Sequence, residues 1–174
     1  VIYEIEQEDR LFDPLLSMKE AVKINHDLVR DSVYSRSVSD LPVGTFLSGG
    51  VDSSIVSLCL AQQSENKIDT FSIGFGNKKY DESYKARIVA KIVGSNHHEF
   101  HFTETNLSDY VDRIFLNFDE PFADSSAIPT HLLACMTSKV LSVVLTGDGG
   151  DEVFGEYNKY YMGMLNQRYI SIIP

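Results

Sequence analysis

The chain has 174 residues, of which 43% are hydrophobic and 23% are charged. This composition is that of an ordinary globular domain, and it argues against a disordered chain, a collagen-like repeat or a coiled coil. The formal net charge of −10 disfavours nucleic acid and anionic membrane surfaces as partners, because both are negatively charged.

The first half of the chain predicts a helix, a strand and a second helix. Residues 1–16 show no clear period, and we expect a linker or an edge element of a preceding domain there, with 17–174 forming the main, truncated domain. Ser17 and Glu20 form a capping box that starts a helix. Its apolar face collects Met18, Ala21, Val22, Asn25, Leu28, Val29 and Val33. A strand over 43–47 then stops at a Ser-Gly-Gly turn. The helix expected over 53–63 has an apolar set that should be buried: Ile55, Val56, Leu58, Cys59 and Leu60.

The second half repeats the alternation of strands and helices. Strands are predicted over 69–75, 97–102 and 143–145 from their β-branched and aromatic content. Asp81 caps a helix that runs to Val93 and ends at Gly94, and further helices are expected over 107–118 and 128–140. Such alternation predicts an α/β fold with an open parallel sheet and helices on both faces.

The loop after the first strand, Ser48–Ser54, has the composition of an anion site. Its backbone amides and the N-terminus of the following helix attract negative charge, and three serines add hydroxyl donors. It lacks the lysine of a Walker A loop, which argues against transfer of a terminal phosphoryl group. Amides, hydroxyls and one carboxylate suit pyrophosphate held with Mg²⁺. The alternative is a tight turn in which glycine supplies the backbone angles and serine caps the helix.

The loop after the last strand, Thr146–Glu152, brings Asp148, Asp151 and Glu152 together beside three glycines. Crowded carboxylates raise one another's pKa unless a cation neutralises them. One interpretation is a Mg²⁺ ligand that faces the first loop across the switch point of the sheet, and the other is a solvated acidic turn.

Three motifs together carry a family resemblance. The segment SGGVDSS at Ser48–Ser54 resembles the pyrophosphate loop of the N-type ATP pyrophosphatases. Combined with DEPFADSSAIPT at Asp119–Thr130 and TGDGGDEVFGEY at Thr146–Tyr157, it resembles the synthetase domain of glutamine-dependent asparagine synthetases, across residues 41–161. The resemblance implies the fold of adenine-nucleotide alpha-hydrolase-like proteins.

The resemblance also implies roles for individual residues. The β and γ phosphates of ATP would lie on Ser48, Gly49, Gly50, Asp52, Ser53 and Ser54. Mg²⁺ would be held by Asp52 and Asp151, and adenine would be read by the main chain of Leu47, Ile73 and Gly74. Glu120 would accept a proton from the attacking ammonia. The loop that faces aspartate and the adenylate would contain Asp148, a catalytic candidate, with Gly147 and Gly149.

The implied reaction is ATP-dependent amide formation by a ligase of the glutamine-hydrolysing asparagine synthetase type. The side chain of aspartate is adenylated with release of pyrophosphate, and ammonia then gives asparagine. The alternatives are an amidotransferase that acts on another carboxylate, such as a sugar acid or a β-lactam precursor, and a nucleotide-binding module without chemistry.

The chain also departs from the family pattern. No cysteine lies near the N-terminus, so the family's glutaminase domain is expected to be a missing partner of the same chain, and this fragment alone is expected to be inactive. The apolar C-terminal stretch is expected to be exposed and to favour self-association, including a homodimer.

Other residues favour plain interpretations. His97, Glu99 and His101 alternate along one strand and are expected to be satisfied polar positions, because ligands spaced two residues apart span too far for one metal ion. Cys59 and Cys135 lie far apart in apolar runs, as expected for buried thiols in a reducing compartment. With no apolar run of membrane-spanning length and no signal peptide, we expect a cytoplasmic protein with small-molecule substrates.

Overall fold

The computed structural model describes residues 16–76, 81–102, 116, 126–155 and 157–172. Its helices are α1 (Met18–Ser37), α2 (Val51–Gln63), α3 (Ser83–Val93), α5 (Ala127–Thr137), α6 (Gly150–Phe154) and α7 (Asn158–Ile172). Its strands are β1 (Val43–Phe46), β2 (Asp69–Phe75), β3 (Asn96–Phe102) and β4 (Val143–Leu145). The helix predicted over 107–118 falls outside the described residues, except for Leu116.

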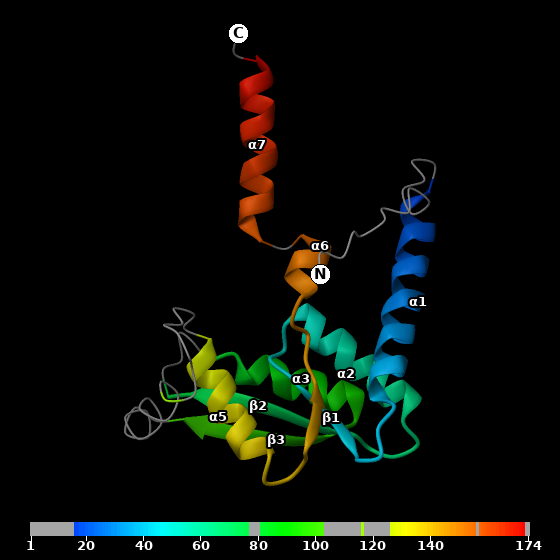
Figure 1. Cartoon of the computed structure of the whole chain (residues 1–174), viewed down its shortest axis with the longest axis vertical. Coiled ribbons are helices and arrows are strands. Elements are labelled where there is room, and N and C mark those ends of the chain that lie inside the picture. Colours follow the sequence, from blue (N-terminus) through cyan, green and yellow to red (C-terminus); the bar gives the residue numbers. More distant parts are fainter. Residues whose placement is uncertain (1–15, 77–80, 103–115, 117–125, 156, 173–174) are drawn as a thin grey trace.

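The four strands form one parallel sheet in the order β3-β2-β1-β4. Helices α2 and α3 pack side by side against one face, and α5 packs against the other (Figure 1). The predicted open α/β architecture is therefore confirmed. The chain proceeds outward from β1 to β3 and then returns to the opposite side of β1, so the switch point lies between β1 and β4.

Two small apolar clusters hold the helices to the sheet. One joins α1 and α2 through Val33, Cys59, Leu60 and Ile68, and the other joins Leu47 to Ala86 and Ala90 of α3. Buried hydroxyls are paired as well. The Thr45 and Ser57 hydroxyls lie 2.7 Å apart, and the Ser57 hydroxyl also donates to the Ser53 carbonyl at 2.7 Å. These bonds tie the start of α2 to β1, directly beneath the first glycine loop.

Helix α1 begins with the predicted capping box. The Ser17 backbone N–H donates to the Glu20 carboxylate at 2.9 Å, and the Glu20 N–H donates to the Ser17 hydroxyl at 3.3 Å. Of its predicted apolar face, Val33 is buried, whereas Met18, Val22 and Leu28 are exposed. The first turns of α1 extend beyond the sheet and α2 (Figure 1), so this half of the face lacks a covering element among the described residues.

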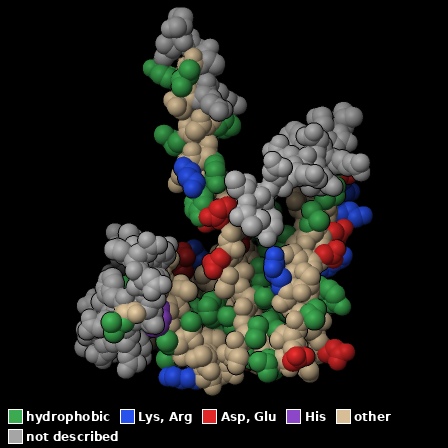
Figure 2. Space-filling view, viewed as in Figure 1, with side chains coloured by type: hydrophobic (Ala, Val, Ile, Leu, Met, Phe, Trp, Pro, Cys, Tyr) green, Lys and Arg blue, Asp and Glu red, His purple; other side chains and the backbone are tan. Residues whose placement is uncertain are grey.

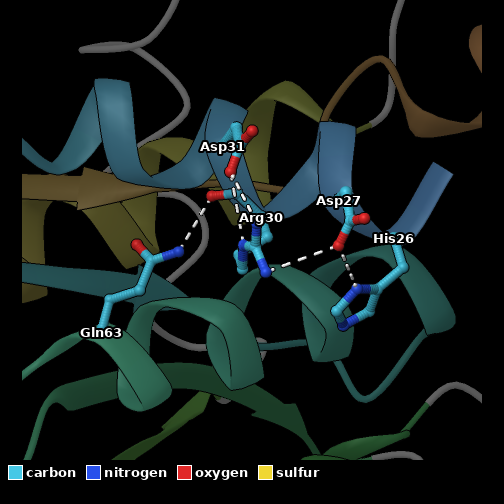
Figure 3. A network of polar contacts seen from close by, with 5 residues as sticks. All are labelled: His26, Asp27, Arg30, Asp31 and Gln63. Atoms are coloured by element: carbon cyan, nitrogen blue, oxygen red, sulfur yellow. Dashed lines mark hydrogen bonds and ion pairs between the residues drawn. The ribbon is translucent and has the colours of Figure 1, made fainter. Parts of the chain in front are cut away.

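The contact between α1 and α2 continues in a polar network (Figure 3). Arg30 lies 3.4 Å from Asp27 and 3.2 Å from Asp31, and its backbone carbonyl accepts a hydrogen bond of 2.9 Å from the Gln63 side chain at the end of α2. His26 contacts the Asp27 carboxylate at 3.2 Å. The Gln63 hydrogen bond joins the two helices, whereas the ion pairs lie within α1, are exposed and contribute little stability.

Several local expectations need correction. Ile55 and Leu58 of α2 are 40% and 41% exposed. The helix is apolar around most of its circumference, but only one side of it contacts the sheet. Helix α5 ends at Thr137, three residues earlier than predicted. Cys135 is only partly buried, whereas Cys59 is buried, and both thiols are free.

The helix start predicted at Asp81 is shifted by one residue. Glu82 is the N-cap of α3, and Asp81 accepts the Ser83 backbone N–H at 3.0 Å. That hydrogen bond is the main reason that the pKa of Asp81 is lowered. Gly94 ends α3 in the left-handed conformation, at φ 73°, as expected.

His97 is a satisfied polar residue, as predicted. Its ring nitrogens lie 2.9 Å from the Thr70 hydroxyl and 3.1 Å from the Ser72 hydroxyl. Burial lowers the pKa of His97, so these bonds hold a neutral ring at pH 7. Glu99 lies 2.8 Å from Arg87 and 3.2 Å from His101.

Helix α7 projects away from the sheet and its helices (Figure 1). Its described side chains are exposed, and Figure 2 shows apolar side chains along it. The exposed apolar set is Tyr160, Tyr161, Met162, Met164, Leu165, Tyr169 and Ile170. Across the described ranges, no helix combines the length and hydropathy needed to cross a lipid bilayer.

Candidate functional site

A cavity of about 460 Å³ opens at the carboxyl edge of the sheet, at the predicted switch point. It is lined by residues from the ends of β1, β2 and β4 and from the helices that follow them. The sequence-predicted residues that line it are Leu47, Ser48, Gly50, Asp52, Ser53, Ile73, Gly147, Asp148 and Asp151. The two glycine loops, about a hundred residues apart in sequence, therefore form one site.

Other predicted residues do not line this cavity. The Ser54 hydroxyl donates to the Gly50 carbonyl of the preceding turn. Gly74 is buried in β2, opposite His101 of β3. Gly149 lines an adjoining, mostly apolar cavity of about 390 Å³ between α1, α2 and α6. Glu120 lies outside the described residues.

Gly49 supports the loop rather than facing the cavity. Its φ of +84° is one that residues with a side chain rarely adopt, and an added Cβ would lie 2.5 Å from Lys85 Cβ and 2.6 Å from the Ala86 backbone nitrogen. The first turn of α3 thus packs directly on the first loop. Glycine at this position allows that approach.

The first loop presents backbone amides that lack a partner among the described residues, whereas its Ser53 hydroxyl donates to the Gly50 carbonyl at 3.3 Å. Gly50 is the N-cap of α2, and no side chain caps this end of the helix. The first-turn amides of α2 have no carbonyl partner within the helix, and the helix dipole adds positive potential. The Ser48 and Ser53 hydroxyls are 2.9 Å apart, and Ser48 accepts the Gly50 N–H at 3.2 Å. This arrangement can bind phosphate oxygens.

The second loop packs tightly against Asp52. A Cβ added to Gly147 would lie 2.8 Å from the Ser53 nitrogen, and one added to Gly150 would collide with the Asp52 carboxylate. The Thr146 hydroxyl donates to Asp148 at 3.0 Å and orients that side chain. Glu152, the third acid of the loop, does not line the cavity; it accepts a 2.7 Å hydrogen bond from Tyr157, which raises the pKa of Tyr157 to about 12.

The cavity is strongly acidic. Its described lining contains the carboxylates of Asp52, Glu82, Asp148 and Asp151 and no lysine, arginine or histidine. Partial burial, and then the negative charge of Asp151, raise the pKa of Asp52. A carboxylate whose ionised form is destabilised by a neighbouring negative charge is suited to share a cation with that neighbour.

These residues fit Mg²⁺ better than a metal held by the protein alone. Mg²⁺ is usually bound by one or two carboxylates, with the remaining ligands supplied by water and substrate phosphates. Asp52 and Asp151 supply such a pair. Within the described ranges there is no group of three or more His, Cys, Asp or Glu residues that could hold a metal ion.

The structure also adds residues that sequence reasoning missed. Glu82 and Ser83, from the start of α3, line the cavity beside Ser72 and Phe75 of β2, and α5 contributes Thr130 and Leu133. Thr130 belongs to a motif already singled out. Glu82 carried no sequence signal, because its place at the site depends on how α3 packs against the first loop.

Comparison with known proteins agrees with this geometry. The profile of the asparagine synthase family matches residues 25–174. A Methanocaldococcus jannaschii protein, provisionally named asparagine synthetase [glutamine-hydrolyzing] 2, is 40% identical over 153 residues, which are 87% of this chain and 30% of that protein. Asparagine synthetase [glutamine-hydrolyzing] 1 of Bacillus subtilis is 37% identical over 139 residues, or 80% of this chain and 22% of that protein. The chain thus spans less than a third of the length of these relatives.

Among solved structures, an NH3-dependent NAD synthetase from Campylobacter jejuni, in complex with the nitrate ion, superposes with a TM-score of 0.50 at 16% identity. The match covers 79% of this chain and 59% of that one. At this identity the likeness concerns the fold, which is the one expected from the first loop. Because the family profile matches residues 25–174, the chain belongs to the asparagine synthase family.

Proposed function

We propose that this chain is the nucleotide-binding part of an ATP-dependent ligase that forms an amide from a carboxylate and ammonia. One observation carries the proposal: Asp52 and Asp151, in the first turns of the helices that follow β1 and β4, line one cavity with the uncapped N-terminus of α2. The amides at this N-terminus can donate hydrogen bonds to phosphate oxygens, and the two carboxylates can bind a cation.

The residues of the cavity suggest how ATP would be held. The first-turn amides of α2 and the Ser48 and Ser53 hydroxyls would bind the β and γ phosphates. Leu47 is fully buried, and its N–H donates to the Phe71 carbonyl at 2.8 Å. The Leu47 carbonyl and the main chain of Ile73 would then form hydrogen bonds with the adenine base. Mg²⁺ held by Asp52 and Asp151 would neutralise charge on the phosphates.

The proposed chemistry has two steps. A carboxylate oxygen of the acceptor, proposed to be aspartate, attacks the α phosphorus, and pyrophosphate leaves as the bond between the α phosphorus and the bridging oxygen breaks. Ammonia then attacks the acyl carbon, AMP leaves, and Glu120 accepts the proton that nitrogen loses. Asp148, oriented by Thr146, would face the acceptor. The names of the relatives suggest that ammonia comes from glutamine, hydrolysed by a domain outside this chain.

Calorimetric titration with Mg·ATP tests the proposal. The wild-type chain should bind Mg·ATP, and Asp52→Ala should bind it at least tenfold more weakly, because half of the carboxylate pair is removed. Asp40→Ala, at an exposed position outside the cavity, is the matched control and should keep the wild-type affinity. Chelating Mg²⁺ should weaken the wild type more than the Asp52 variant. Equal affinities of the wild type and Asp52→Ala would contradict the assignment.

A further inference from the structure

The charge of the cavity raises a problem that the proposed function leaves open. Four carboxylates line the described part of the cavity without a cationic side chain. ATP or pyrophosphate with one Mg²⁺ still carries net negative charge, and an uncompensated anion beside carboxylates is repelled. A cation from just outside the lining would relieve this repulsion.

Two described cationic side chains lie near this lining: Arg36 lines the adjoining cavity that Asp52 and Asp148 also line, and Lys85 pairs with Glu82 of the cavity itself. Of these, Lys85 also packs on the first loop. It lies in the first turn of α3, where the backbone approaches Gly49 so closely that a Cβ on Gly49 would meet Lys85 Cβ at 2.5 Å. Its ammonium group lies 2.6 Å from the carboxylate of Glu82, which lines the cavity. Lys85 is thus connected to the first loop through its backbone and to the cavity through its ion pair.

The position of Lys85 is also unfavourable for the helix by itself. Cations are destabilising in the first turn, where the helix dipole is positive. The pair with Glu82 offsets part of that effect, but exposed i,i+3 pairs contribute little to stability. The hydrogen bond and charge of Glu82 raise the pKa of Lys85, so its ammonium group stays protonated.

We propose that Lys85 is a polyphosphate-binding residue that leaves Glu82 and pairs with phosphate oxygens when the ligand enters. This inference rests on the proposed function. The exchange costs little, because both partners are substantially exposed, at 41% and 60% for the Lys85 and Glu82 side chains. Lysine has a flexible four-carbon stem that lets the ammonium group move without a shift of α3.

The test uses the whole chain and two probes, Mg·pyrophosphate and Mg·ATP, titrated by calorimetry. Lys85→Met should weaken both by tenfold or more, and Lys85→Arg should recover much of the loss because it restores the charge. Lys91→Met is the matched control, because it removes a lysine from the last turn of the same helix. Lys91 lines a different cavity, at the opposite edge of the sheet. Its affinities should equal those of the wild type.

A second variant distinguishes a role of Lys85 in ligand binding from a purely structural role of its ion pair with Glu82. Glu82→Gln frees Lys85 and removes a negative charge from the cavity, so it should strengthen Mg·pyrophosphate binding. If the pair merely stabilised α3, Lys85→Met and Glu82→Gln would change affinity in the same direction. Wild-type affinity in Lys85→Met, or a loss in Glu82→Gln equal to that in Lys85→Met, overturns the inference while the proposed function stands. A wild-type chain that binds neither probe overturns both.

Discussion

Gly49 and Gly149 each occupy a backbone conformation that disfavours side chains, but their surroundings differ. Gly49 has φ +84° and packs against the α3 backbone, whereas Gly149 has φ +89° and open space around its missing Cβ. A substitution at Gly149 meets backbone strain alone. A substitution at Gly49 meets the same strain and also has to displace the first turn of α3.

We expect Gly49→Ala to destabilise the chain more than Gly149→Ala. Backbone strain should cost about 1–2 kcal/mol at either site. At Gly49 the contact with Lys85 and Ala86 adds to it. Urea unfolding measures the difference. Gly163→Ala, in α7 with no neighbouring atom near the added Cβ, is the control and should not destabilise. Equal losses at Gly49 and Gly149 would show that the loop moves away from α3 without cost.

The carboxylate of Asp52 makes stability depend on pH. Its pKa is raised in the folded chain, so the folded state holds this proton more tightly than the unfolded state. The contribution favours folding at pH values below the ordinary pKa of 3.8 and is lost as pH rises through the raised folded value. Above that value, the ionised Asp52 opposes folding unless a cation binds.

Without Mg²⁺, Asp52→Asn should therefore raise the Tm at neutral pH, and the Tm of this variant should fall less steeply than that of the wild type as the pH rises above 4. Asp151→Asn should act in the same direction, because Asp151 is the like charge beside Asp52. Thermal unfolding followed by circular dichroism across pH 3–8 measures both, with exposed Asp40→Asn as the control. A fall in the Tm of Asp52→Asn at neutral pH would mean that the ionised carboxylate is favourably hydrogen-bonded and not repelled.

The loop residues could be predicted from sequence, and the α3 residues could not. Asp52, Asp148 and Asp151 stand beside glycines at the ends of apolar strands, and strand ends meet at one edge of a parallel sheet. Glu82 and Lys85 stand in an ordinary polar helix start. The place of Glu82 in the cavity and the contact of Lys85 with Gly49 come from helix packing across more than thirty residues, which no local pattern encodes.

At the level of elements, strands were predicted closely and the helix surfaces less well. Strand β2 has the predicted bounds, and β1, β3 and β4 differ from them by at most one residue. Periodicity shows which side of a helix is apolar, but not whether another element covers it. For that reason Ile55 and Leu58 were wrongly expected to be buried, and the first half of the apolar face of α1 is exposed.

The exposed start of α1 makes its cap important. Ser17→Ala removes the hydroxyl that accepts the Glu20 N–H, and N-cap substitutions of this kind cost about 1 kcal/mol. Few tertiary contacts support the first turns, so we expect faster amide hydrogen exchange over residues 18–24 with little change in the Tm. Ser39→Ala, beyond the end of the helix, should leave this exchange unchanged. Unaltered protection over 18–24 would mean that packing, not the cap, holds the first turns of α1.

For the whole molecule, the main feature is the apolar surface on α1 and α7. Met18 is 80% exposed, and Met162 and Ile170 are 61% and 63% exposed. Soluble domains rarely expose apolar side chains in such sets unless another surface covers them. The relatives described above are about three to four times as long as this chain.

The isolated chain should accordingly self-associate as its concentration rises. Light scattering over a concentration series should show growing mass. The double variant Met162→Lys, Ile170→Lys should reduce the growth, because two charges then interrupt the apolar surface of α7. Lys159→Glu, which changes charge without removing apolar area, is the control. A monodisperse monomer at every concentration would contradict the prediction.

The position of β4 has a consequence for how the chain reaches its native state. Among the described strands, β4 pairs only with β1, joining Val143 to Val43 from about a hundred residues away, whereas the pairings among β1, β2 and β3 join segments close in sequence. Closing a long loop costs more entropy than closing a short one, and distant pairings slow folding. The three-stranded half should form first, and the two glycine loops should meet only in the last step of refolding.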